Sequence, residues 1–172
     1  MGVRLPTDNV GKVQRTTAHG RCPLAIQSSG MTRHTTTHSA EETIAYGRSL
    51  AVELSPPQIV LLRGDLGAGK TTLVKGIAEG FHAARAEDVT SPTFTLVHEY
   101  RGATVTLYHI DLYRIDTERE LETLALDDLL APNCILLIEW GEKFSQLQRD
   151  RHVEIVLERV GETERRIWRT AH

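Results

Sequence analysis

A glycine-rich loop between two apolar segments is the strongest constraint on the fold of this chain. Residues 64–71 read Gly-Asp-Leu-Gly-Ala-Gly-Lys-Thr and fit the pattern G-x-x-x-x-G-K-[ST]. The apolar run 59–62 before them is typical of a buried strand, and the stretch 72–81 after them is compatible with a helix. Because glycines permit a tight turn, successive N–H groups of the loop can converge on phosphate oxygens at the helix start. This strand–loop–helix context predicts a phosphate-binding P-loop and, with it, a nucleoside triphosphate ligand.

Two acidic residues that close apolar runs are candidates for a cation site. In a P-loop, Lys70 reaches the β- and γ-phosphates and the Thr71 hydroxyl holds Mg²⁺. The second oxygen ligand usually comes from an acid at the carboxyl end of a buried strand. Glu139 follows the run 135–138 and is the best candidate, whereas Asp111 is the competitor, with orientation of the attacking water as its alternative role. A structural role, capping a loop or pairing with an arginine, remains the alternative for either acid.

Two further features lie where P-loop proteins sense their nucleotide. Residues 91–93, Ser-Pro-Thr, stand between the P-loop helix and the next strand, and a hydroxyl there, such as that of Thr93, can sense the γ-phosphate. The alternative is a proline turn that simply begins a strand. Trp140 directly follows Glu139, which suggests stacking or partner contact, with half-buried packing as the alternative.

The remaining patterns predict an α/β fold of the P-loop NTPase type, with three layers and a mixed parallel and antiparallel sheet. A capping-box pattern at 39–42 opens an amphipathic helix that ends before Pro56. A second capping box begins at Thr117 and opens a short helix. Antiparallel hairpins are expected from two pairs of β-rich runs, 94–100 with 104–111 and 153–158 with 165–170.

Composition restricts the class of protein. A chain of 172 residues with 40% hydrophobic and 25% charged residues suits one ordinary soluble globular domain. A net charge of −3 offers no broad basic field for nucleic acid. Its two cysteines, Cys22 and Cys134, indicate neither a disulfide framework nor a zinc site, and no apolar stretch is long enough to span a bilayer. We therefore expect a cytoplasmic protein without membrane contact.

The first 33 residues differ from the rest. They contain five basic residues against the single acid Asp8, without apolar periodicity. We predict a disordered basic tail over 1–33 and a single P-loop ATPase domain over 34–172. The alternatives are a true start at Met31, a targeting segment, and an RNA-contacting arm.

The motifs that are missing after the P-loop indicate which nucleotide binds. A small GTPase should carry Asp-x-x-Gly and Asn-Lys-x-Asp after the loop, but the only asparagine after Thr71 is Asn133, followed by cysteine. This favours ATP over GTP. A small-molecule kinase needs an acceptor site and usually a basic lid, and little sequence remains for either.

Four motifs together resemble the bacterial TsaE family, the ATPase component of tRNA threonylcarbamoyladenosine synthesis. They are residues 64–72, 91–97, 108–114 and 138–140, whose order and spacing agree with the family from about Ser39 to the final hairpin. The P-loop alone is unspecific, whereas the four together are highly specific. The departures are Phe94, where the family often has tyrosine, and the segment through about Gly30, which has no counterpart.

The resemblance implies specific roles at matching positions. Lys70, Asp111 and Glu139 are the expected catalytic residues, and Thr71 and Glu139 the expected Mg²⁺ ligands. The expected ATP-binding residues are Asp65, Leu66, Gly67, Ala68, Gly69, Lys70, Thr71, Thr72, Thr93 and Trp140. The segment 37–40 is expected near the adenine, and either Arg165 or Arg166 near the nucleotide.

The resemblance also implies partners and a reaction. Family members act with TsaB and TsaD, which transfer a threonylcarbamoyl group to the N6 of a tRNA adenosine beside the anticodon. The expected function is Mg²⁺-dependent ATP binding and weak hydrolysis that assists or regulates this complex, with only indirect contact to tRNA. Two alternatives stay open, a small-molecule kinase and a nucleotide-gated scaffold that does not hydrolyse ATP.

Overall fold

A seven-stranded sheet forms the centre of the molecule. The computed structural model describes residues 32–148 and 151–172, and the sheet order within them is β1-β7-β6-β2-β5-β4-β3. The strands are β1 Arg33–Thr37, β2 Gln58–Arg63, β3 Val97–Arg101, β4 Thr106–Asp111, β5 Cys134–Glu139, β6 His152–Arg159 and β7 Arg165–Ala171. The helices are α1 Ala40–Ala51, α2 Lys70–Gly80, α3 Glu118–Thr123 and α4 Leu126–Leu129, with 3₁₀ turns at Ala86–Asp88, Gly141–Lys143 and Ser145–Leu147.

The sheet has a parallel centre and antiparallel edges. Strand β2 lies between β5 and β6 and is parallel to both, and β4 is parallel to β5. Strands β3 and β4 form one antiparallel hairpin, β6 and β7 form another, and β1 pairs antiparallel with β7 at the far edge. The central strands are apolar almost throughout because both of their faces are covered. The predicted α/β fold with a mixed sheet is therefore confirmed.

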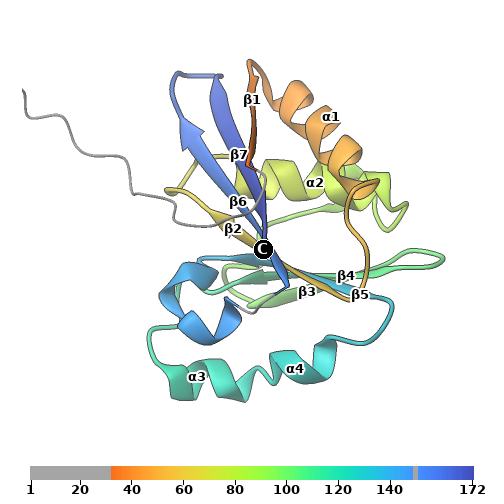
Figure 1. The fold of residues 1–172 in the computed structure, drawn as a ribbon, viewed down its shortest axis with the longest axis vertical. Coiled ribbons are helices and arrows are strands. Elements are labelled where there is room, and N and C mark those ends of the chain that lie inside the picture. The colour runs from red at the N-terminus through yellow and green to blue at the C-terminus, as the bar shows by residue number, and fades with distance from the viewer. Residues whose placement is uncertain (1–31, 149–150) are drawn as a thin grey trace, which may run out of the picture.

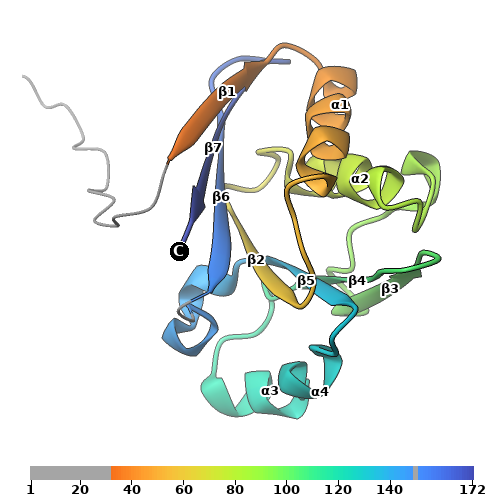
Figure 2. The same ribbon diagram turned by 45° about the vertical axis from the view of Figure 1, so that its right-hand side comes forward.

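Helices cover both faces of the sheet (Figure 1), with α1 and α2 on one face and α3 and α4 on the other, as the turned view also shows (Figure 2). Alternate residues of β2 enter the two cores. Val60 and Leu62 pack with Leu73 and Ile77 of α2, while Leu61 packs in the core on the opposite face, under α3. This period of two is the pattern expected of a strand buried on both sides. None of the helices in the described ranges is long and apolar enough to cross a membrane.

Helices α1 and α2 cross in close backbone contact at two glycines. A Cβ atom on Gly76 would lie 2.0 Å from the carbonyl oxygen of Ile44, and one on Gly47 would lie 2.5 Å from that of Leu73. Only the absence of side chains allows this approach. The contact fixes α2, and therefore the loop that precedes it, against the first helix.

The local helix signals are largely confirmed. The Ser39 side chain accepts a hydrogen bond from the Glu42 amide, and Thr117 with Glu120 forms a complete capping box. One detail of the first cap is wrong, because the Glu42 carboxylate accepts from the backbone of His38 rather than from that of Ser39. The first helix also ends at Ala51, shortly before the proline pair that was expected to stop it.

Two segments differ from the prediction. Residues 94–96 form a turn instead of the start of a strand, with Leu96 at φ 65° and its amide bonded to the Pro92 carbonyl oxygen at 2.6 Å. Strand β1 was not predicted, and Arg33, assigned above to the basic tail, is its first residue, opposite Arg169 of β7. The rest of the predicted tail, apart from residue 32, lies outside the described residues.

Candidate nucleotide-binding site

A pocket lies at the carboxyl ends of the parallel strands. Strand β2 runs into the glycine-rich loop, β4 ends at Asp111 and β5 ends at Glu139, and these two acids are paired in the register of β4 and β5. Parallel neighbours end at one edge of the sheet, which is where α/β proteins bind ligands. The cavity has a volume of about 480 Å³. Its lining comprises Leu66, Gly67, Gly69, Lys70, Thr71, Thr72, Ser91, Thr93, Asp111, Tyr113, Glu139, Trp140 and Arg165.

The loop 64–69 has the conformation that its glycines allow. Gly64, Gly67 and Gly69 all have positive φ, and a Cβ on Gly64 would lie 2.3 Å from the Leu157 carbonyl oxygen. Helix α2 begins at Lys70 with Gly69 as its N-cap, so no side chain of the cap occupies the first amides of the helix. These amides and the positive end of the helix dipole face the pocket, which suits an anionic ligand.

The Lys70 side chain is folded back against the loop and is only 4% exposed. Its Nζ donates to the carbonyl oxygens of Gly64 and Asp65 at 2.7 and 3.1 Å. The same atom lies 3.8 Å from Glu139 Oε2 and 4.4 Å from the centroid of the Trp140 ring. Burial lowers the pKa of Lys70, and the neighbouring carboxylates oppose that effect. The lysine is therefore held inside the site by acceptors that a phosphate group can replace.

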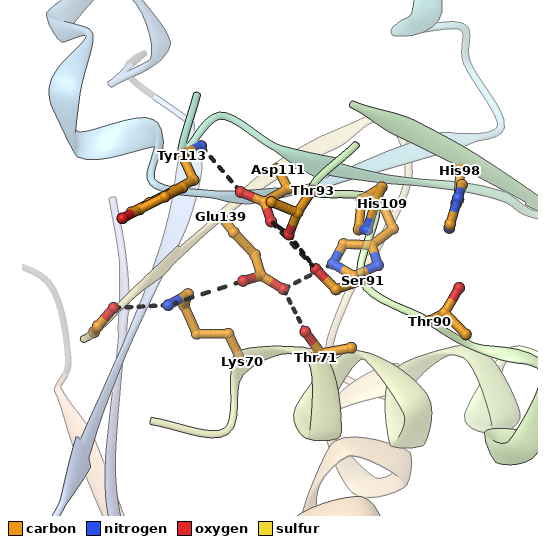
Figure 3. A network of polar contacts seen from close by, with 12 residues as sticks. Lys70, Thr71, Thr90, Ser91, Thr93, His98, His109, Asp111, Tyr113 and Glu139 are labelled. Atoms are coloured by element: carbon orange, nitrogen blue, oxygen red, sulfur yellow. Dashed lines mark hydrogen bonds and ion pairs between the residues drawn. The ribbon is translucent and has the colours of Figure 1, made fainter. Parts of the chain in front are cut away.

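The side chains of Glu139 and Thr71 are hydrogen-bonded to each other. The Thr71 hydroxyl donates to Glu139 Oε1 at 3.0 Å, as Figure 3 shows. A hydroxyl that donates a hydrogen bond to a carboxylate keeps its oxygen lone pairs free, and the pair offers the hard oxygen ligands that Mg²⁺ prefers. Over residues 32–148 and 151–172, no group of three or more His, Cys, Asp or Glu side chains could hold a metal ion. The two residues fit a cation whose remaining ligands are supplied by phosphate and water.

Asp111 is engaged by the loop that follows α2. Its Oδ2 accepts hydrogen bonds from Thr93 at 2.6 Å and from Ser91 at 3.2 Å, and the two hydroxyls contact each other at 2.8 Å. Its Oδ1 accepts from the Tyr113 amide at 2.9 Å (Figure 3). The carboxylate thus ties the 91–93 loop, which directly precedes the turn at 94–96, to the end of β4.

An aromatic pair lines the pocket beside the lysine. Trp140 has a left-handed backbone, with φ 62°, and its ring lies over Lys70. The Tyr113 ring is 5.3 Å from the Trp140 ring and tilted by 57°. Lys143 Nζ donates to the carbonyl oxygens of Leu112, Tyr113 and Ile115, at 2.8–3.3 Å, and so fastens the loop that carries this tyrosine.

Most of the residues predicted for the site line the pocket. The exceptions are Asp65, which contributes its carbonyl oxygen to Lys70, and Ala68, which is buried in the core beneath the loop. Of the two candidate arginines, Arg165 lines the cavity and contacts the Gly67 carbonyl oxygen at 3.4 Å. Arg166 instead pairs with Glu158 and is absent from the lining.

A smaller cavity of about 150 Å³ adjoins the first. Its lining includes Ser39, Ala40 and Thr43, and it shares Gly69, Thr72 and Arg165 with the larger pocket. Part of the segment 37–40, expected near the adenine, thus borders this second cavity.

Two residues of the site were not among those predicted, His109 and Tyr113, and Ser91 was predicted only as part of the 91–93 loop. His109 is completely buried, and its Nε2 lies 2.8 Å from Glu139 Oε1. A signal for it was present in the sequence, because His109 and Asp111 are two residues apart and so share one face of a strand. Ser91 lies in the 91–93 loop that the sequence singled out, but its bond to Asp111 depends on a turn that sequence periodicity does not reveal.

The fold and the glycine-rich loop define a P-loop protein of the α/β class. Comparison with known proteins specifies the family. A family model described as threonylcarbamoyl adenosine biosynthesis protein TsaE matches residues 37–167. The chain belongs to the TsaE family, whose role is in the biosynthesis of threonylcarbamoyladenosine in tRNA.

Individual relatives agree with this assignment. The tRNA threonylcarbamoyladenosine biosynthesis protein TsaE of Bacillus subtilis is 41% identical over 135 residues, 78% of this chain and 83% of the relative. The TsaE protein of Rickettsia conorii is 39% identical over 130 residues, 76% of this chain and 73% of the relative. The crystal structure of YdiB from Bacillus subtilis superimposes with a TM-score of 0.67 at 33% identity and covers 84% of this chain and 88% of that one.

Proposed function

We propose that this protein binds ATP with Mg²⁺ in the pocket and hydrolyses it slowly, and that this cycle regulates a partner complex of the TsaB and TsaD type. That complex transfers the threonylcarbamoyl group to the N6 of a tRNA adenosine. The observation that supports ATP and Mg²⁺ most directly is the 3.0 Å contact between Thr71 and Glu139 beneath an open glycine-rich loop. A cytoplasmic location follows from a role in tRNA modification.

Nucleotide binding is assigned to the two adjoining cavities. The amides of the loop and of the first turn of α2 hold the phosphates, and Lys70 exchanges the carbonyls of Gly64 and Asp65 for phosphate oxygens. The smaller cavity beside Ser39 receives the base, because it continues from the phosphate pocket through Gly69 and Thr72. ATP is favoured over GTP because the guanine-reading Asn-Lys-x-Asp sequence is missing.

Thr71 and Glu139 would hold the cation. When bound, Mg²⁺ supplies charge neutralisation on the phosphate oxygens. The protein side chains orient the phosphates and limit access of water. Lys70 orients the phosphates, and the ring of Trp140, against which Tyr113 packs, shields that lysine from water.

Slow turnover by the isolated protein is expected. An arginine aimed at the γ-phosphate can accelerate hydrolysis by about 10³–10⁵. The guanidinium of Arg165 is instead bonded to carbonyl oxygens of its own turn, at Gly161, Glu162 and Glu164. A partner that supplies an arginine, or that releases Arg165 from these carbonyl oxygens, would therefore accelerate hydrolysis.

Partner docking is assigned to the rim of the pocket. Leu66 and Phe94 are 80% and 85% exposed, and Tyr113 is half exposed. Large exposed apolar side chains are typical of protein interaction sites. Phe94 directly follows the loop that Asp111 holds, so a nucleotide that moves Thr93 also moves part of the docking surface.

The test combines binding with turnover. The protein is purified with its candidate TsaB- and TsaD-like partners in ATP, in ADP and without nucleotide, and single-turnover hydrolysis is measured with and without the partners. Retention of the partners only with ATP, together with faster hydrolysis in their presence, supports the proposal. Equally fast hydrolysis by the isolated chain contradicts it.

The same experiment separates the two alternatives. Transfer of the phosphoryl group to a metabolite would indicate a small-molecule kinase. Tight ATP binding without any ADP formed would indicate a nucleotide-gated scaffold. Lys70→Ala should abolish function as an ATPase or kinase, whereas a scaffold would lose only part of its docking.

A further inference from the structure

A buried histidine lies directly behind the proposed cation ligand. His109 is 0% exposed and comes from β4, the strand next to β5, which carries Glu139. Its Nε2 atom is 2.8 Å from Glu139 Oε1, the same oxygen that accepts the Thr71 hydroxyl (Figure 3). A buried imidazole in contact with a carboxylate of the site is a strong and specific interaction, which general packing does not require.

The hydrogen-bond partners define the form of the imidazole. A carboxylate oxygen only accepts, so His109 Nε2 carries the hydrogen and donates it. The other ring nitrogen, Nδ1, is buried and has no hydrogen-bond partner among the described residues. Among the described residues, the ring therefore has a single hydrogen-bond partner, Glu139.

This contact determines which oxygen of Glu139 is available. Oε1 already accepts from two donors, His109 and Thr71, whereas Oε2 faces the pocket, where Lys70 Nζ lies 3.8 Å away. The terminal torsion of a glutamate is broad and is fixed only by its partners. Without the histidine, the carboxylate can turn toward the lysine and form a closer ion pair, which would occupy both residues.

We propose that His109 is a positioning residue that locks the Glu139 carboxylate in the orientation needed to hold a divalent cation and keeps it from collapsing onto Lys70. The inference rests on the proposed function, since the cation is that of the Mg²⁺–ATP complex. It adds a role for a residue that contacts neither nucleotide nor cation. Such supporting partners typically change metal affinity about 10- to 100-fold when they are removed.

The test measures ATP affinity with Mg²⁺ and with EDTA, using equilibrium titration of a fluorescent ATP analogue. His109→Phe keeps an aromatic ring but removes the donor. It should lose about 10-fold or more of the Mg²⁺-dependent gain in affinity, while the affinity in EDTA stays within about threefold of the wild type. His109→Gln places an amide nitrogen close to the position of Nε2 and should restore most of the gain.

Controls separate this role from a structural one. His34→Phe, on the exposed edge strand β1, should leave both affinities unchanged. Circular dichroism and thermal unfolding establish that each variant is folded. If His109→Phe does not fold, His109→Asn serves in its place, since its shorter amide cannot reach Oε1 and should show the same loss.

Two results would overturn the inference alone. One is an unchanged Mg²⁺-dependent gain in both His109→Phe and His109→Asn. The other is an equal loss of affinity with Mg²⁺ and with EDTA, which would indicate a disturbed pocket. A wild-type protein whose ATP affinity is the same in Mg²⁺ and EDTA would instead refute the proposed function, and this inference with it.

Discussion

The glycine contact between α1 and α2 gives a prediction whose sign depends on two opposing effects. Alanine favours a helix over glycine by about 1 kcal/mol, so Gly76→Ala would stabilise an isolated helix. In the folded protein its Cβ would lie 2.0 Å from the Ile44 carbonyl oxygen, whereas ordinary contact begins at 3.4 Å. The two backbones must then separate by about 1.4 Å, because neither atom belongs to a side chain that can rotate away.

The steric effect should exceed the gain in helix propensity. Overpacking of a core typically costs about 1–3 kcal/mol, and a clash of two backbones lies at or above the upper end of that range. Separation of the helices also loosens the contacts of Leu50 with Leu73 and Val74 in the shared core. A steric cost of about 3 kcal/mol is offset by about 1 kcal/mol of helix propensity. We therefore expect Gly76→Ala to lower the free energy of unfolding by about 2 kcal/mol, which corresponds to about 4–8 °C in Tm for a domain of this size.

Chemical denaturation of three variants measures the effect. Gly47→Ala should also destabilise the fold, since its Cβ would meet the Leu73 carbonyl oxygen at 2.5 Å. The double variant should lose less than the sum of the single losses, because helices that one methyl group has separated leave room for the second. A Gly76→Ala protein as stable as the wild type, or more stable, would refute the argument.

Three further predictions concern the site. Asp111→Asn should abolish the difference between ATP and ADP in partner co-purification, because an amide cannot accept at both positions that the loop hydroxyls and the backbone amide now use; partner retention that still depends on ATP would contradict this role. Lys143→Met should lower Tm by a few degrees and shift the fluorescence of Trp140, measured in a Trp168→Phe background, since three backbone carbonyls lose their donor; an unchanged spectrum would count against the proposed fastening of the loop. Lys70→Met should alter the pH dependence of stability. Because burial lowers the pKa of Lys70, the folded state binds fewer protons there than the unfolded state between the lowered value and about 10.5, so wild-type stability should rise relative to the variant across that range. Parallel curves of unfolding free energy against pH would show that this reasoning is wrong.

The parts of the fold that sequence could predict are those with local causes. Strand β2, the glycine-rich loop and α2 follow from an apolar run, positive-φ glycines and a helical stretch that adjoin one another. Strand β5 and its terminal Glu139 were equally visible, because a strand covered on both faces is a continuous apolar run. The capping box at Thr117 needs only four consecutive residues and is formed as expected.

The features that sequence could not predict depend on distant partners. Strand β1 reads Arg-His-Thr-Thr-Thr, a polar edge strand that forms only because β7, more than 120 residues later, lies beside it. The turn at 94–96 replaces the start of a β-rich run, and the loop before it is held by Asp111, which lies 18 and 20 residues after Thr93 and Ser91 in the sequence. The pairing of His109 with Glu139 likewise joins two strands whose register the sequence does not state.

The folded-back Lys70 has a consequence for how the molecule releases its ligand. The ammonium group of Lys70 already has partners before a triphosphate enters the pocket. Two carbonyl oxygens accept its hydrogen bonds, and a carboxylate lies nearby. Occupancy therefore exchanges one set of acceptors for another, and the net gain is smaller than the number of new contacts suggests. If the site binds a nucleotide as proposed, its release returns Lys70 to acceptors that are already in place, so no uncompensated charge is left behind. Such reversibility would suit repeated binding and release of a nucleotide better than its long retention.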